Sequence, residues 1–115
     1  MMPKNCGGDV YVEQLVLLGK ALADPCRVRM LRLLAEGRGC CGLSPLNTCD
    51  LDGLYVCELQ DHFNLGQSKV SYHLKILKDA GLVRETMRGK WTVYSLAEDA
   101  ARDSLSLLQR QLKLD

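Results

Sequence analysis

Apolar positions recur at helical spacing in the first part of the chain. In residues 10–22 they stand at Val12, Leu15, Val16, Gly19 and Leu22. A period of about 3.6 residues is typical of an amphipathic helix. These residues therefore predict a first helix over 10–22.

A second helix is predicted from Pro25 to the residue before Gly37. Asp24 fits the N-cap and Pro25 the first helical position, where proline costs no hydrogen bond. Gly37 is a stop signal. One face of this helix is apolar through Val28, Leu31, Leu34 and Ala35.

Residues 37–53 lack a sustained period and contain four glycines and a proline, so we interpret them as a loop or irregular insertion. Helical patterns resume at residues 54–61 and 67–80. The turn between them contains Gly66. Two helices joined by a tight glycine-containing turn predict a helix-turn-helix over residues 54–80.

The second helix of this pair has two chemically different faces. Val70, Leu74 and Leu77 lie within about 60° of one another and predict the buried face. The opposite face carries side chains that hydrogen-bond or contact phosphates and base edges, namely Ser68, Ser71, Tyr72 and Lys75. This chemistry suits the DNA major groove.

After Gly81 the pattern changes to that of a β-hairpin. Two β-branched and aromatic runs surround a glycine turn and predict a wing over residues 82–96, with Arg88 and Lys90 beside its tip. Ser95 and Glu98 have the spacing of a capping box, which predicts a last helix over residues 97–114. Its apolar stripe is formed by Ala97, Ala101, Leu105, Leu108 and Leu112.

The expected fold is mainly α with a small β-hairpin, a single winged helix-turn-helix domain over residues 1–115. The chain is too small to bury both terminal helices alone, so they predict the interface of a homodimer. The side chains expected in this interface are Leu15, Leu18, Leu105, Leu108 and Leu112.

Charge is unevenly distributed along the 115 residues. The net charge is only +1, yet residues 66–94 contain six basic and two acidic side chains. Residues 39–61 contain four acidic side chains and no lysine or arginine. The basic segment favours DNA as a partner. No apolar run resembles a membrane span or a signal peptide, so we expect a cytoplasmic protein without a membrane partner.

Six cysteines are many for such a short chain, namely Cys6, Cys26, Cys40, Cys41, Cys49 and Cys57. In a reducing compartment, clustered cysteines more often bind metals or act in redox chemistry than form disulfides. For single residues we expect plainer roles. Cys26 is interpreted as a core residue, His73 as packed and hydrogen-bonded, and His62 as solvated or capping.

Three stretches resemble the ArsR/SmtB family of bacterial metal-sensing repressors. They are ALADPCRVRMLRLL, LGQSKVSYHLKILKDAGLV and RGKWTVYSL, which lie between residues 15 and 96. The resemblance implies a homodimeric repressor that binds an imperfect inverted repeat and releases it when an inducer binds. The DNA-contacting positions that it implies are Gln67, Ser68, Lys69, Ser71, Tyr72 and Lys75, with Arg88 and Lys90 on the wing.

Arsenic-responsive members resembling this chain have a motif of the form Leu-Cys-Val-Cys-Asp-Leu. Here the matching residues 54–59 read LYVCEL, so only Cys57 carries over. The nearest further thiolates are in the insertion, at Cys40, Cys41 and Cys49. Soft thiolates select thiophilic ions. Because the helix that contains Cys57 is expected to pack directly against the recognition helix, an ion pulling Cys57 toward the insertion is expected to move the recognition helix.

The expected inducer is trivalent arsenic, as arsenite or an organoarsenical, and no organic cofactor is expected. A soft divalent ion such as cadmium, lead or zinc, and persulfide or redox sensing through cysteines, remain alternatives. A purely structural zinc site is a third, although the usual spacing of zinc-binding cysteines is absent. Enzymatic motifs are lacking, with no C-x-x-C and no phosphate-binding glycine loop, so we do not expect an enzyme.

Overall fold

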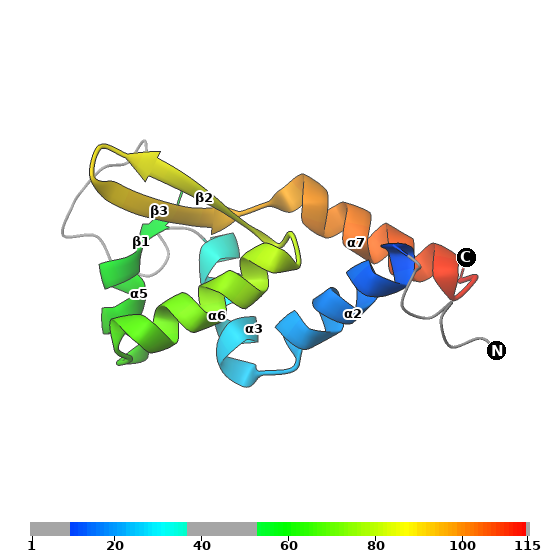
Figure 1. The fold of residues 1–115 in the computed structure, drawn as a ribbon, viewed down its shortest axis with the longest axis horizontal. Coiled ribbons are helices and arrows are strands. Elements are labelled where there is room, and N and C mark those ends of the chain that lie inside the picture. Colours follow the sequence, from blue (N-terminus) through cyan, green and yellow to red (C-terminus); the bar gives the residue numbers. More distant parts are fainter. Residues whose placement is uncertain (1–9, 37–52, 115) are drawn as a thin grey trace.

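The computed structural model describes residues 10–36 and 53–114. Figure 1 shows helices on one side of a small antiparallel sheet. Along the chain the elements are α2 (Val10–Leu22), α3 (Pro25–Glu36), β1 (Leu54–Tyr55), α5 (Val56–Phe63), α6 (Gln67–Asp79), β2 (Val83–Arg88), β3 (Trp91–Leu96) and α7 (Glu98–Gln111). The expected winged helix-turn-helix is confirmed.

The two predicted N-terminal helices are confirmed as α2 and α3. The Asp24 carboxylate accepts a hydrogen bond of 2.8 Å from the backbone N–H of Cys26 and so caps α3. The apolar positions that indicated α2 are not the ones that meet the core, because Val12, Val16 and Leu22 are exposed while Leu18 and Ala21 are buried. This helix is apolar on several sides, so periodicity alone did not identify the side that meets the core.

Residues 54 and 55 form a strand where the sequence predicted the start of a helix. Leu54 pairs with Tyr94 and Tyr55 with Val93, so β1 is an edge strand beside β3. The helix begins only at Val56, with the Glu58 carboxylate accepting a 2.8 Å hydrogen bond from the Tyr55 backbone N–H. The difference has a tertiary cause, since β1 exists only because β3 lies beside it.

The helix-turn-helix otherwise matches its prediction. At the end of α5, Asn64 adopts a left-handed conformation with φ of 55°, and the N–H of Leu65 returns to the carbonyl of Gln60 at 3.1 Å. This arrangement stops α5 and redirects the chain. Gly66 is the N-cap of α6.

The wing is confirmed as an antiparallel hairpin of β2 and β3, in a sheet of order β1-β3-β2. Gly89 at its turn has a φ of 63°, which glycine adopts without strain. The predicted capping box is wrong. Ser95 lies in β3 opposite Arg84, and the N-cap of α7 is Ala97, which makes no side-chain cap hydrogen bond.

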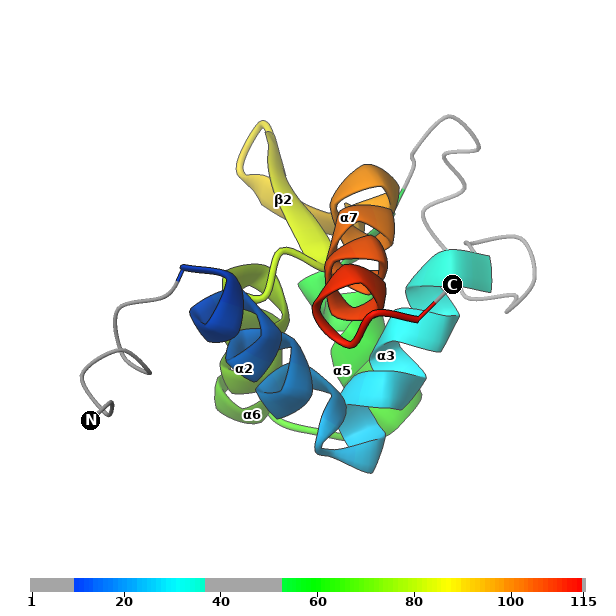
Figure 2. The same ribbon diagram turned by 90° about the vertical axis from the view of Figure 1, so that its right-hand side faces the viewer.

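The core lies where α6 crosses α2, α3 and α5. Met30, Leu59, Leu74 and Leu77 are among its buried members, so the predicted apolar face of α6 is confirmed. At the other end of the molecule, α2 and α7 contact each other and lie side by side (Figure 2). Within the described residues, no helix has the length and apolarity needed to cross a membrane.

Candidate nucleic-acid interface

Helix α6 presents a polar face to solvent. All six side chains expected to contact DNA on this helix are exposed, and Tyr72 retains 59% of its accessible surface. The buried Val70 and Leu74 lie between them in sequence and occupy the opposite face of the helix. The residues on this exposed face are Gln67, Ser68, Lys69, Ser71, Tyr72 and Lys75.

A buried arginine fixes the position of α6. Arg27 Nη1 lies 3.1 Å from Nδ1 of His73, while Nε and Nη2 donate to the carbonyls of Ala21 and Lys20 at 3.1 and 2.8 Å. The prediction of a packed, hydrogen-bonded His73 is confirmed. Burial lowers the pKa of His73 below its usual value, so the ring is neutral near pH 7. Arg27 therefore links the middle of α6 to the end of α2.

A surface network ties the wing to the C-terminal part of α6. Lys78 Nζ donates to Glu85 Oε1 at 2.7 Å, and the Tyr94 hydroxyl donates to Glu85 Oε2 at 2.6 Å. The hydrogen bonds from Lys78 and Tyr94 lower the pKa of Glu85. Burial, together with the Glu85 carboxylate, raises the pKa of Tyr94 to about 12. The network orients β2 and β3 relative to α6, which the sequence did not reveal.

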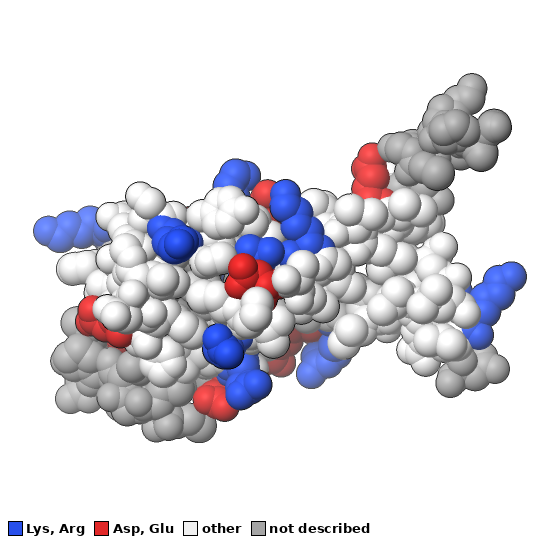
Figure 3. Space-filling model, turned by 90° about the horizontal axis from the view of Figure 1, so that it is seen from below, with Lys and Arg blue, Asp and Glu red and all other residues white. Residues whose placement is uncertain are grey.

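Two ion pairs neutralise part of the positive charge of the interface. Lys75 pairs with Asp79 at 3.2 Å and Lys78 with Glu85 at 2.7 Å. Figure 3 shows lysine and arginine side chains interspersed with fewer acidic ones on the face seen there. Within the described part of the chain, the remaining basic residues of the 66–94 segment form no ion pair. They are Lys69, Arg84, Arg88 and Lys90.

Cys57 is exposed beside both parts of this interface. A cavity of about 250 Å³ lies between α5, the start of α6 and the wing. Cys57 and Gln60 line it from α5, Gln67 from α6, and Lys90 and Trp91 from the wing side. Cys57 therefore shares a cavity with two residues that are predicted to contact DNA. Cys6, Cys40, Cys41 and Cys49 lie outside the described residues.

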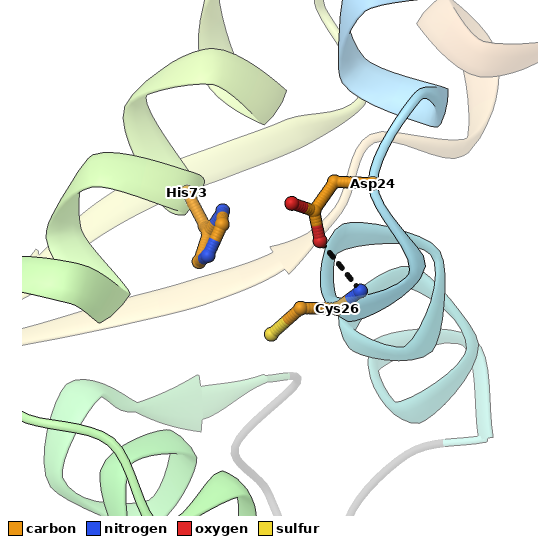
Figure 4. A group of neighbouring side chains, drawn as sticks. All are labelled: Asp24, Cys26 and His73. Carbon is orange, nitrogen blue, oxygen red and sulfur yellow. Dashed lines mark hydrogen bonds between the residues drawn. The ribbon is translucent and has the colours of Figure 1, made fainter.

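A second group of chemically reactive side chains was missed by the sequence analysis. Asp24, Cys26 and His73 converge at the N-terminal end of α3 (Figure 4). Burial raises the pKa of the Cys26 thiol, and the hydrogen bond from the Cys26 N–H lowers that of Asp24. Cys26 packs partly buried against the core, as expected. Its neighbour His73 is far away in sequence, so only the spacing of Asp24 and Cys26 was visible beforehand.

The predicted dimer residues differ in their surroundings. Leu105 and Leu112 are exposed at 60% and 59%, whereas Leu15 and Leu108 are partly buried. Leu18 belongs to the buried core of its own chain. An apolar groove of about 350 Å³ runs between α2, α3 and α7, and both Leu18 and Leu105 line it.

A helix-turn-helix with an exposed polar second helix, followed by a basic hairpin, defines a winged-helix DNA-binding regulator. The family model described as "Bacterial regulatory protein, arsR family" matches residues 49–85. The chain belongs to the ArsR family of transcriptional regulators and is not an enzyme.

Curated relatives support this assignment. The arsenical resistance operon repressor of Bacillus subtilis is 39% identical over 87 residues, which are 76% of this chain and 70% of that protein. The HTH-type transcriptional regulator CmtR of Mycobacterium bovis is 37% identical over 102 residues, 88% of this chain and 74% of its own length.

A solved structure agrees with them. The homodimeric winged helix-turn-helix DNA-binding domain of a possible ArsR-family regulator from Mycobacterium bovis has a TM-score of 0.63 and 25% identity. The match covers 98% of this chain and 88% of that one.

Proposed function

We propose that this protein is a homodimeric repressor that releases its operator when trivalent arsenic binds cysteine thiolates. The observation that carries the proposal is the placement of Cys57. Its exposed thiol lines a cavity whose other walls include Gln67 of the recognition helix and Lys90 of the wing. An ion held here lies beside two elements that must be placed correctly to bind DNA.

The ligand set we propose is Cys57 together with thiolates from Cys40, Cys41 and Cys49. Soft thiolates favour thiophilic ions over hard cations. A relative named as an arsenical resistance operon repressor supports arsenic as the inducer. The alternative inducers are cadmium, lead and zinc. The energetic demand is modest, because an ion that favours the DNA-free conformation by about 1.4 kcal/mol lowers operator affinity tenfold.

We propose that α6 enters the major groove of an imperfect inverted repeat and that the wing contacts the flanking backbone. Base edges are read by the exposed side chains of α6. Arg88 and Lys90 lie on either side of Gly89 at the tip of the hairpin, where they neutralise phosphates. The proposed contacts are Gln67, Ser68, Lys69, Ser71, Tyr72, Lys75, Arg88 and Lys90.

Two copies of the chain pair through α2 and α7 in this proposal. Both helices expose large apolar side chains, including Val16, Leu105 and Leu112. The similarity to a solved domain described as homodimeric supports a dimer. A two-fold dimer presents two recognition helices to the two halves of an inverted repeat.

The arsenic proposal is tested by titrating the fully reduced protein with arsenite under anaerobic conditions and recording the ultraviolet sulfur-to-arsenic absorption. We expect saturation at about one arsenite per subunit, because trivalent arsenic binds three thiolates and the four proposed cysteines of a subunit supply only one such set. Cys57→Ser is expected to abolish both this signal and arsenite-induced release of operator DNA. A double Cys40→Ser/Cys41→Ser variant is expected to weaken binding.

Cys26→Ser is the matched control, because this thiol belongs to α3 and does not line the Cys57 cavity. Its arsenite response is expected to equal that of the unaltered protein. A Cys57→Ser protein that still releases DNA normally would refute the mechanism. Saturation by cadmium or zinc that is lost in Cys57→Ser, with no response to arsenite, would instead assign a divalent inducer.

The dimer is tested with Leu105→Asp, which places a charge in the proposed interface. Because Leu105 is exposed at 60% in the single chain, the substitution is expected to spare the fold while shifting sedimentation equilibrium toward monomer. Operator affinity is expected to fall at least about tenfold, since one subunit reads only a half-site. Ser106→Asp, on an exposed position of the same helix, is the control. A Leu105→Asp protein that remains dimeric would contradict this interface.

A further inference from the structure

Three side chains of different ligand types converge where the N-terminal end of α3 meets α6. A carboxylate oxygen of Asp24, the sulfur of Cys26 and a ring nitrogen of His73 all lie within 4.8 Å of one another. Figure 4 shows the Asp24 and Cys26 side chains on the side of α3 that faces His73. Oxygen, sulfur and nitrogen donors are the ligands that zinc uses in proteins.

The three ligand atoms are close enough together to approach the separations found in a tetrahedral zinc site. Ligand atoms at about 2.0–2.3 Å from a zinc ion lie roughly 3.3–3.8 Å apart. The present separations, within 4.8 Å, require a closure of at most about 1.5 Å. The cap hydrogen bond from the Cys26 N–H to Asp24 Oδ1, at 2.8 Å, already holds the first two ligands together.

We propose that Asp24, Cys26 and His73 bind a divalent ion of the zinc type, with a solvent molecule completing four-fold coordination. This site goes beyond the arsenic site at Cys57 and shares no residue with it. Its carboxylate, thiolate and imidazole form a harder set of ligands than a cluster of thiolates does, and such a set suits a divalent ion of the zinc type. A site with three protein ligands and an open position is a common zinc arrangement.

The local charges make both anionic ligands necessary. Arg27, Arg29 and Lys69 lie close enough to act electrostatically on Cys26. Their positive charge opposes a cation, and the N-terminal end of a helix does so too. Asp24 and a Cys26 thiolate together offset the ion's two charges. Losing either one leaves a net positive site, so each single substitution is expected to disrupt binding.

Ion binding also competes with Arg27 for His73. Arg27 can only donate, so Nδ1 of the neutral ring accepts its hydrogen bond and Nε2 carries the proton. A nitrogen that binds an ion must be unprotonated, so coordination through either nitrogen ends the Arg27–His73 hydrogen bond. The ion thus replaces a contact from Arg27 to α6 by a direct link between α6 and the start of α3. The adjacent residue on α6, Tyr72, belongs to the proposed DNA face.

The test uses Co²⁺ as an optical substitute for zinc. In the full chain carrying serine at Cys6, Cys40, Cys41, Cys49 and Cys57, only Cys26 remains as a thiol. We expect sulfur-to-cobalt charge-transfer absorption and the visible bands of a tetrahedral ion, saturating at about one Co²⁺ per subunit. In this background Asp24→Asn, Cys26→Ser and His73→Gln are each expected to lower Co²⁺ affinity at least about tenfold.

Two of these variants preserve the local structure. Asparagine retains an oxygen acceptor for the α3 cap, and serine is close to cysteine in size. If His73→Gln fails to fold, Asp24→Asn and Cys26→Ser still decide the question. His62→Gln is the control, because His62 is an exposed histidine outside the cluster. Its Co²⁺ affinity is expected to be unchanged.

A chain with Cys26 as its single thiol that gives no cobalt–sulfur absorption would overturn the proposal. So would absorption that survives Asp24→Asn undiminished, because it would come from the thiol without the carboxylate. Since this background lacks Cys57, neither result bears on arsenite sensing. Conversely, failure of the arsenite titration would leave this site unaffected.

Discussion

Replacing Arg27 with methionine is expected to lower the free energy of unfolding by about 3 kcal/mol. Only 7% of the Arg27 surface is exposed. Its guanidinium donates hydrogen bonds to the carbonyls of Lys20 and Ala21 and to the His73 ring. Methionine fills much of the same space but donates no hydrogen bond. Two backbone carbonyls and one ring nitrogen then lose the guanidinium as a donor, while the Lys20 carbonyl keeps its 3.3 Å hydrogen bond from the Ala23 N–H.

Thermal unfolding measures this effect, and we expect the midpoint to fall by about 10 °C at matched protein concentration. Arg29→Met is the control on the same helix, because Arg29 is exposed. Its effect is expected to stay within about 0.5 kcal/mol. Equal stabilities for the two variants would show that the Arg27 hydrogen bonds do not hold α6 against α2.

Replacing Tyr72 with alanine is expected to reduce operator affinity by about tenfold or more. Tyr72 is exposed in the middle of the polar face of α6, so its side chain is available to a base edge in the major groove. An operator duplex recovered by selection from a randomised pool provides the ligand. Fluorescence anisotropy measures the affinity for this duplex and for one of scrambled sequence.

A comparison with Lys90→Ala separates sequence reading from phosphate binding. Lys90 lies at the tip of the wing and is expected to contact the backbone. Its loss should weaken binding to both duplexes alike and lower the slope of log affinity against log salt by about one. Tyr72→Ala should instead weaken mainly the selected duplex. An unchanged operator affinity in Tyr72→Ala would exclude this residue from the reading face.

The two candidate ion sites reach the DNA-binding elements by different routes. Cys57 lines a cavity shared with Gln67 and Lys90, so a ligand there acts between the start of α6 and the wing. His73 takes part in the second site and lies in the middle of α6. In both proposals the ion acts on the placement of α6, whose position also depends on the buried contact between His73 and Arg27.

The sequence by itself determined the helices, the helix-turn-helix and the wing. These elements follow from periodicity and from local signals such as Pro25 after Asp24, the Asn64–Gly66 turn and Gly89 in the hairpin. The side chains on the outer face of α6 followed from the same reasoning, because a helix with one apolar stripe exposes the opposite side. Such signals act between residues a few positions apart.

Only the tertiary structure decided which contacts distant segments make. The strand at Leu54 depends on Tyr94, and Ser95 lies in the β-ladder instead of capping α7. The cluster of Asp24, Cys26 and His73 forms only because α3 and α6 meet. No local pattern encodes such meetings, because they arise when apolar faces from separate parts of the chain share one core.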